Sequence, residues 1–265
     1  MPDALPDFRE PPLQEVALSV QFTPLDALSV PHIGLLWDGF RERFPKTEEH
    51  PPIEPAFERF GAVQIREPIR LRVRQKYPRP RVWFVNDEET NLLQIQEDRF
   101  VSNWRRRSAE AEYPRYPILR KSFLGDFGTF QDFVRAHDLG ELDLVQCEVT
   151  YVNHFELPEP LTIGEAVTVF RESYSEPFLP DIEGGALRLR YVITCADKPC
   201  GRLHVHADLS RQSGVRLVLT ARGPLRGGES TEGVCGFFDL GHEWIVRGFT
   251  AMTSGQLHKK WGRTQ

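Results

Sequence analysis

The sequence has few cysteines and no long hydrophobic run. Its 265 residues include four cysteines without the dense spacing of a disulfide framework, which agrees with a reducing compartment where thiols pack as small apolar groups. No apolar segment approaches the roughly 18 residues that cross a bilayer, and segment 1–12 lacks the basic and apolar regions of a signal peptide. We therefore expect a cytoplasmic protein with no membrane partner.

An excess of positive charge is also missing. The chain carries 33 lysines and arginines against 38 acidic residues, a net charge of −5. This balance disfavours a strongly basic nucleic-acid-binding protein but allows a local basic patch. A hydrophobic fraction of 40 % is enough for the packed core of one large domain or two small ones.

The common catalytic signatures do not occur. The glycine-rich segment 223–233 lacks the Lys-Ser/Thr ending of a phosphate-binding loop, and no G-x-G-x-x-G motif follows a predicted strand. Neither a G-x-S-x-G elbow nor an H-E-x-x-H helix is found. The sequence therefore leaves open whether the protein is an enzyme, and it indicates no catalytic residue and no cofactor.

A central segment, Leu142–Phe155, organises the chain. Apolar or buried-type residues at every second position alternate with polar ones, which is typical of a half-buried antiparallel strand: Val145, Cys147, Val149, Tyr151 and Asn153. After a proline break, Thr162 and Glu165 have the spacing of a capping box and predict a short helix over 163–174.

The same order opens the chain, where a strand over 13–22 and a proline-marked break precede a helical stripe over 33–40. Further strands are predicted at 57–65, 69–77, 81–86, 91–96, 186–195, 202–208 and 215–221. A loop is expected over 44–55, helices over 98–139 and a final helix over 237–260.

These elements predict an α+β fold. We expect an antiparallel sheet with helices on one face, built from two pseudo-repeated β-α-βββ-α halves. The first half would span 1–140, with three or four strands after its helix, and the second 141–265. Together the halves would form one integrated domain.

One predicted strand has an unusual charge pattern. Arg70, Arg72 and Arg74 share one face of strand 69–77, and like charges in such a row are most stable where acids or an anion face them. In the second half, Arg188 and Arg190 share one face of strand 186–195. One face of strand 202–208 likewise holds Arg202, His204, His206 and Asp208. Two interpretations remain open, a solvated outer face or a site for an anion.

From these patterns we predict a set of ligand-binding residues: Arg70, Arg72, Arg74, Tyr151, Asn153, His204 and His206. The favoured function is a non-enzymatic binding or regulatory module that uses a polar, partly basic sheet face. Its partner would be an anionic ligand, a nucleic acid or another protein. The alternative is an enzyme with a polar site at the seam between the halves, built from Tyr151, Asn153, His154, His204 and His206.

Two weaker patterns involve cysteine. Cys195, Cys200, His204 and His206 read C-x4-C-x3-H-x-H, which departs from the usual zinc spacings, so we expect no metal, although a hairpin could bring the two cysteines together. Cys235 and His242 are seven residues apart and could suggest a thiol–imidazole pair. We expect Cys235 to precede the final helix, which disfavours that pair.

Four phrases occur together along the chain: PPLQEVALSVQF, LLQIQEDRFVSNWR, EVTYVNHF and FDLGHEWIVRGFTAMTSGQLHKKWGR. Their pattern of PPLxEV, DRFxxNW, a YxN strand and HxxWGR resembles a sporadically distributed, uncharacterised bacterial family of about this length. The resemblance implies a bacterial cytosolic origin and one architecture, and it carries no activity. The residues it highlights are Asn103, Trp104, Tyr151, Asn153, His258 and Trp261, of which Trp104 and Trp261 could simply hold helices against the sheet.

Overall fold

A computed structural model describes residues 4–61, 79–108, 110–157, 159, 161–168, 183–210, 213–225 and 231–264. In this part of the chain the fold is mixed α+β with an antiparallel sheet, as the sequence predicts. The sheet has nine strands, and five helices accompany it. The chain divides into two compact units. Unit 1 comprises Met1–Ala17, Glu148–Arg222 and Gly236–Gln265, and unit 2 comprises Leu18–Cys147 and Gly223–Cys235.

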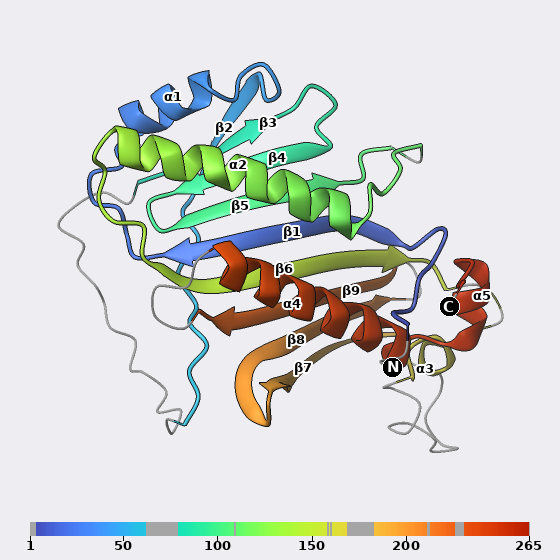
Figure 1. Ribbon diagram of the computed structural model, residues 1–265. Coiled ribbons are helices and arrows are strands. Elements are labelled where there is room, and N and C mark those ends of the chain that lie inside the picture. The colour runs from blue at the N-terminus through green and yellow to red at the C-terminus, as the bar shows by residue number, and fades with distance from the viewer. Residues whose placement is uncertain are drawn as a thin grey trace. The chain divides into compact units, whose positions relative to one another are not determined.

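Unit 2 contains the first seven elements, of which the first strand begins in unit 1. They are β1 (Leu13–Phe22), α1 (Val30–Asp38), β2 (Lys46–His50), β3 (Arg81–Val85), β4 (Asn91–Gln96), β5 (Arg99–Arg105) and α2 (Tyr116–Ala136). The strand order is β2-β3-β4-β5-β1. Figure 1 shows α2 lying across the strands of this unit.

The core of unit 2 lies between α2 and the sheet. Phe123, Phe127 and Phe130 recur at helical spacing, so they share one side of α2, and all three are fully buried. Their ring centroids lie 5.4–5.6 Å from that of Phe100 on β5. This aromatic cluster determines which face of the sheet α2 covers, namely the face that carries Phe100.

Unit 1 holds most of the second half of the chain. Its elements are β6 (Leu144–Phe155), which begins in unit 2, α3 (Ile163–Ala166), β7 (Gly184–Cys195), β8 (Lys198–Ser210), β9 (Gly214–Pro224), α4 (Thr231–Met252), whose first turn belongs to unit 2, and α5 (Gly255–Lys260). The strand order is β6-β9-β8-β7.

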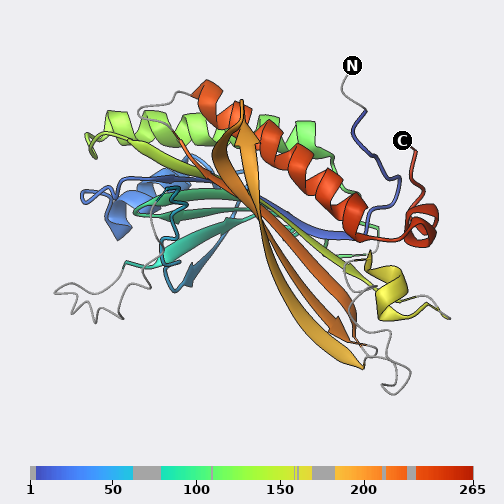
Figure 2. The same ribbon diagram turned by 90° about the horizontal axis from the view of Figure 1, so that it is seen from below.

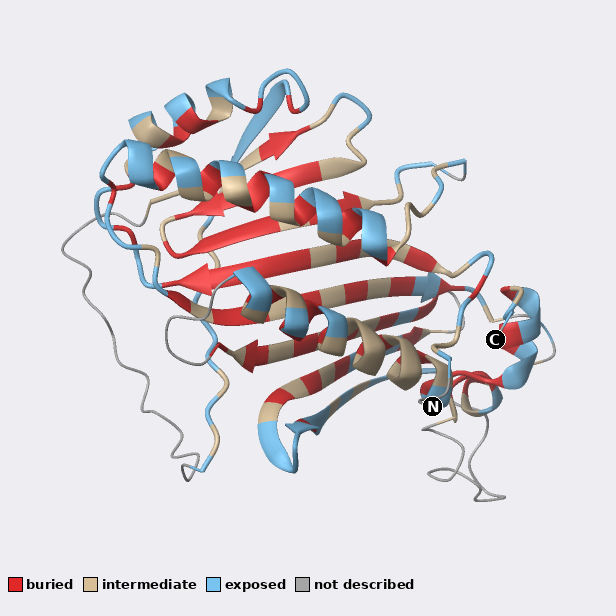
Figure 3. Cartoon of the chain, viewed as in Figure 1, coloured by how far each residue is buried: buried red, intermediate tan, exposed pale blue. Residues whose placement is uncertain are grey.

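Helix α4 packs closely on the strands of unit 1, as Figure 2 shows. A Cβ atom built on Gly241 would lie 3.1 Å from the Cβ of Ala221 and 3.2 Å from a methyl of Val149. Glycine therefore allows the helix to approach the sheet closely at this point. The alternation of buried and less buried residues along β6 is visible in Figure 3 and agrees with the predicted half-buried strand.

Three predictions for unit 2 are wrong. Residues 99–105 form a strand and not a helix, because this segment pairs in antiparallel register with β4 and buries Phe100 beneath α2. Lys46–His50, expected to be a loop, is an edge strand paired with β3. Residues 57–60 are not in a strand, and the segment 69–77 lies outside the described residues.

The C-terminal prediction needs two corrections. The expected single helix is two helices: α4 ends at Met252, and Ser254 caps α5 by accepting a hydrogen bond from the Leu257 amide. Cys235 lies within α4 and does not precede the helix. The capping box of Thr162 and Glu165 is confirmed at the start of α3.

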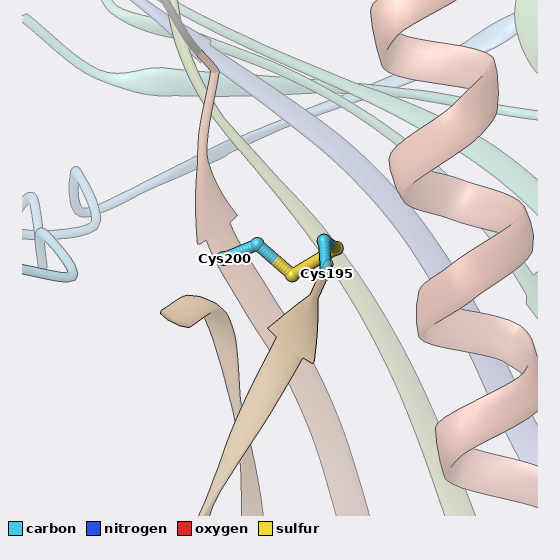
Figure 4. Close-up of a disulfide and its surroundings, with 2 residues drawn as sticks. All are labelled: Cys195 and Cys200. Carbon is cyan, nitrogen blue, oxygen red and sulfur yellow. A yellow bond between two sulfur atoms is a disulfide. The ribbon is translucent and has the colours of Figure 1, made fainter. Parts of the chain in front are cut away.

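The β7–β8 hairpin carries a disulfide between Cys195 and Cys200, shown in Figure 4. The turn that joins the two strands places Ala196 and Asp197 at φ values of 47° and 60°, the left-handed conformation of a tight hairpin turn. The bond corrects the expectation that these two cysteines are thiols, while Cys147 and Cys235 are not part of a disulfide.

The helices of the described segments were compared with the requirements of a membrane span. None of them combines sufficient length with sufficient apolar character.

Candidate functional site

Two of the predicted site residues are buried on the helix side of β6. Tyr151 is 6 % exposed, and its hydroxyl oxygen lies 2.9 Å from Nδ1 of His242 on α4. Asn153 is 4 % exposed and donates to the carbonyl oxygen of Leu217 on β9 at 3.2 Å. Both side chains are occupied by contacts that hold unit 1 together, and neither faces solvent.

The two predicted histidines lie on the other face of the same sheet. His204 and His206 pair across β8 and β9 with Thr220 and Val218. The hydroxyl of Thr220 is 2.9 Å from that of Thr150 on β6, and Thr150 points away from its chain neighbour Tyr151 because side chains alternate along a strand. Cross-strand partners share a face, so the histidines lie on the face of Thr220 and Thr150, which is the face away from Tyr151.

The strand register collects more basic residues around these histidines. Arg190 lies across from His204, and Arg188 across from His206. Because cross-strand partners share a face, the set extends over β7, β8 and β9. We call this set the basic face: Arg188, Arg190, Arg202, His204, His206, Arg216 and Arg222.

Carboxylates neutralise only part of the basic face. The guanidinium of Arg222 is paired with Glu148, and that of Arg216 is 3.9 Å from the carboxylate of Asp208. Arg188 and Arg190 are exposed, and among the described residues no ion pair reaches either of them. A net positive potential therefore remains along β7 and β8.

The electrostatics of His206 reflect this potential. Burial lowers the pKa of His206, and the neighbouring charges of Arg188, His204 and Arg216 lower it further, against an opposing effect of Asp208. The imidazolium form is thus disfavoured while the face is empty. A bound anion would oppose the repulsion from the neighbouring positive charges, because it would face the arginines and the histidine together.

Arg216 and Arg222 were not among the predicted site residues. Along β9 they share a face with Val218 and Thr220, so the period-two pattern of the sequence could have identified them. Arg70, Arg72 and Arg74 lie outside the described residues. Among the described members of the predicted set, His204 and His206 lie together on the face away from the helix, and Tyr151 and Asn153 are buried on the helix side.

The residues proposed for a seam enzyme do not converge. Tyr151 and Asn153 lie on the helix side, whereas His204 and His206 lie on the opposite face. The imidazole of His154 contacts the carbonyl oxygen of Ser213 at 2.8 Å. These side chains therefore cannot surround one substrate in unit 1.

Cys235 and His242 do not form a dyad. Both lie in α4, and seven residues of helix separate them by roughly 10 Å along the axis. His242 is instead committed to Tyr151, and burial lowers its pKa to about 4 despite the opposing charges of Asp239 and Glu243. Its role is consistent with a neutral, structural imidazole.

The described residues line several cavities, two of which have a volume of about 500 Å³. One, of about 500 Å³, lies beside α4 in unit 1 and is lined largely by apolar groups, including Tyr191, Leu203 and Trp244. The other, of about 510 Å³, lies in unit 2 and includes Arg43 and Asp126. These two side chains are already paired with each other, and burial raises the pKa of the Asp126 carboxyl.

The other residues of the resemblance have packing contacts. Trp104 is buried, with its ring centroid 5.3 Å from that of Tyr113. Trp261 packs against Phe155 at 5.0 Å, and the Nε2 atom of His258 is 2.8 Å from the hydroxyl of Thr253. A further buried amide, Asn103, accepts a hydrogen bond from Gln94. These contacts favour a structural role for the two tryptophans.

Metal ligation was considered for the cysteine–histidine pattern of β7 and β8. Cys195 and Cys200 are joined to each other and offer no thiolate, and within the described ranges no three candidate metal ligands gather.

No protein-family model matches the chain, and no curated protein is significantly similar to it. The basic face is therefore the main guide to function.

Proposed function

We propose that the protein is a non-enzymatic binding module that holds a nucleic acid on the basic face through phosphate contacts. The observation that carries this proposal is the pair of cross-strand contacts Arg188–His206 and Arg190–His204, whose arginines have no carboxylate partner in the described chain. Exposed guanidinium groups without a carboxylate partner attract polyanions, and the phosphates of a nucleic acid would supply the missing negative charge.

The form of the face favours an extended partner over a small molecule. Its basic residues are spread over three adjacent strands, and those of β7 are exposed. The face holds no tryptophan, tyrosine or phenylalanine on which a base could stack. Contacts would therefore be mostly to phosphates, which position a nucleic acid but carry little sequence information.

The test is the affinity of the full chain for a fluorescent oligonucleotide, measured by anisotropy. Replacing Arg188 and Arg190 by glutamine should weaken binding at least tenfold, since two phosphate contacts are lost. A matched control, Arg41→Gln with Arg135→Gln, removes the same charge from exposed positions on or beside the helices of unit 2. Circular dichroism would verify that both variants fold.

Equal affinities of the two double variants would remove the proposal. Loss of affinity in both would indicate a response to net charge alone, which also contradicts a defined face. The enzymatic alternative would need Tyr151 and Asn153 at one site with His204 and His206, and these pairs lie on opposite sides of the sheet.

We also propose that the chain is an internal duplication, with halves 1–140 and 141–265. The order of elements supports this, because a strand, a helix, a run of antiparallel strands and a long helix occur twice.

We further propose that the protein belongs to the sporadically distributed bacterial family that the four phrases resemble, and that it is cytoplasmic. The duplication has a test of its own. Superposition of β1-α1-β3-β4-β5-α2 on β6-α3-β7-β8-β9-α4 in an experimental structure would test the duplication.

A further inference from the structure

The face of unit 2 that points away from the aromatic core carries a second polar cluster. Trp83 on β3 points to the opposite side from Phe84, whose ring contacts Phe40 next to α1. The register places Gln94 of β4 directly across from Trp83. This face therefore presents polar side chains where the other face presents the core.

Three cationic or aromatic groups surround the indole of Trp83. The guanidinium carbons of Arg81 and Arg105 each lie 5.4 Å from the ring centroid of Trp83. The imidazole of His50 stacks on the indole at 3.9 Å. Glu48, across from Trp83 on β2, is bound by His50 at 2.9 Å. Positive charge thus gathers around one aromatic ring.

Two buried donors in this cluster have no acceptor. The Nε–H of Arg81 and the Nε1–H of Trp83 are buried and make no hydrogen bond in the described part of the chain. A buried N–H without an acceptor destabilises the fold, and most native proteins avoid it. Both groups are donors, so the missing partner is an acceptor.

The rest of the Arg81 side chain is already oriented. Its Nη1 donates to the amide oxygen of Gln94 at 2.8 Å, and the Gln94 amide nitrogen donates to Asn103 at 2.7 Å. No carboxylate pairs with Arg81 among the described residues. Burial lowers the pKa of Arg81, and the nearby charge of Arg99 lowers it further. The guanidinium is held in a positive environment by neutral amides.

We propose that Arg81 and Trp83 form a binding site for a small oxyanion, a carboxylate or phosphate group of a small molecule. One oxygen would accept from Arg81 Nε and another from Trp83 Nε1, while Arg99 and Arg105 add favourable charge. Charge-assisted hydrogen bonds of this kind are among the stronger polar contacts in proteins. The site shares no residue with the basic face, so it stands or falls independently of nucleic-acid binding.

The test uses the full chain with 15N-labelled tryptophan, which has five indole signals because the sequence holds five tryptophans. The signal of Trp83 is identified by its loss in Trp83→Phe. Inorganic phosphate and acetate are titrated separately at constant ionic strength, with chloride as the reference. We expect a saturable shift of the Trp83 signal with at least one of the two anions, and their relative affinities distinguish the two sources.

Arg81→Gln should weaken that titration at least tenfold, and Arg81→Lys should weaken it as well, because lysine keeps the charge but lacks the Nε donor geometry. Arg41→Gln, an exposed arginine of unit 2, is the control and should titrate as the parent does. An unchanged Trp83 signal with both anions would overturn the proposal. Equal titration of the parent and Arg81→Lys would overturn the donor geometry that underlies it.

Discussion

The hydroxyl of Tyr151 on β6 lies 2.9 Å from Nδ1 of His242 on α4, and this contact links the helix to the sheet in unit 1. Burial lowers the pKa of His242 from an ordinary value of 6.5 to about 4. Between pH 6.5 and pH 4, His242 is therefore protonated in the unfolded chain but neutral in the folded chain. The free energy of unfolding falls as the pH falls through this range.

From this shift we predict a loss of about 2 kcal/mol in the free energy of unfolding between pH 7 and pH 5 that is due to His242. His242→Gln keeps an acceptor for Tyr151 but does not titrate, so its acid-induced loss should be smaller by that amount. Urea denaturation at the two pH values measures the difference. The exposed-site control His137→Gln should keep the full acid sensitivity, and identical acid responses in all three proteins would refute the assignment.

Two glycines of α4 offer a matched comparison. A Cβ on Gly241 would press on Ala221 and Val149 at 3.1–3.2 Å, whereas a Cβ on Gly236 would meet nothing within 4 Å. Gly236→Ala should stabilise the protein by about 0.5–1 kcal/mol, because alanine is the better helix former. Gly241→Ala should be less stable than Gly236→Ala, because α4 or its neighbours must shift. Thermal denaturation of both variants checks the order, and the reverse order would contradict the close packing of α4.

The cysteines give a direct chemical prediction. Denatured protein that was never exposed to reductant should contain two reactive thiols, those of Cys147 and Cys235. After reduction it should contain four. Colorimetric thiol titration makes the measurement. Four thiols before reduction would contradict the Cys195–Cys200 bond.

Binding to the basic face should depend on pH. The pKa of His206 is lowered by burial and then by Arg188, His204 and Arg216, and Asp208 opposes them. A bound polyanion would raise that pKa, so binding takes up protons and strengthens as the pH falls from 7 toward 5.5. His206→Gln should reduce this dependence in oligonucleotide titrations at fixed salt. A pH dependence equal to that of the parent would exclude His206 as its source.

Local patterns predicted much of unit 1. The period-two alternation around Tyr151 identified β6, and the Thr162–Glu165 spacing identified the start of α3. The same alternation assigned Tyr151 and Asn153 to the apolar face. The sequence could not show on which side of the sheet His204 would lie, since that depends on the register with β9.

Non-local contacts account for the predictions that failed. Phe100 and Trp104 are four residues apart, which suits a helix, yet β5 gains its stability from pairing with β4 and from the aromatic side of α2. The charged segment 46–50 reads as a loop but completes an edge by pairing with β3. The cluster at Trp83 depends on side chains from four strands, β2 to β5, and no spacing along the chain indicates it.

The salt dependence of oligonucleotide binding tests the central claim most directly. The slope of log K against log salt concentration reports the number of phosphates neutralised, at about 0.9 per contact for duplex DNA. Arg188→Gln with Arg190→Gln should make the slope shallower by about 2 units, whereas Arg41→Gln with Arg135→Gln should leave it unchanged. An unaltered slope in the first double variant, with its fold intact, would contradict a nucleic-acid site on the basic face.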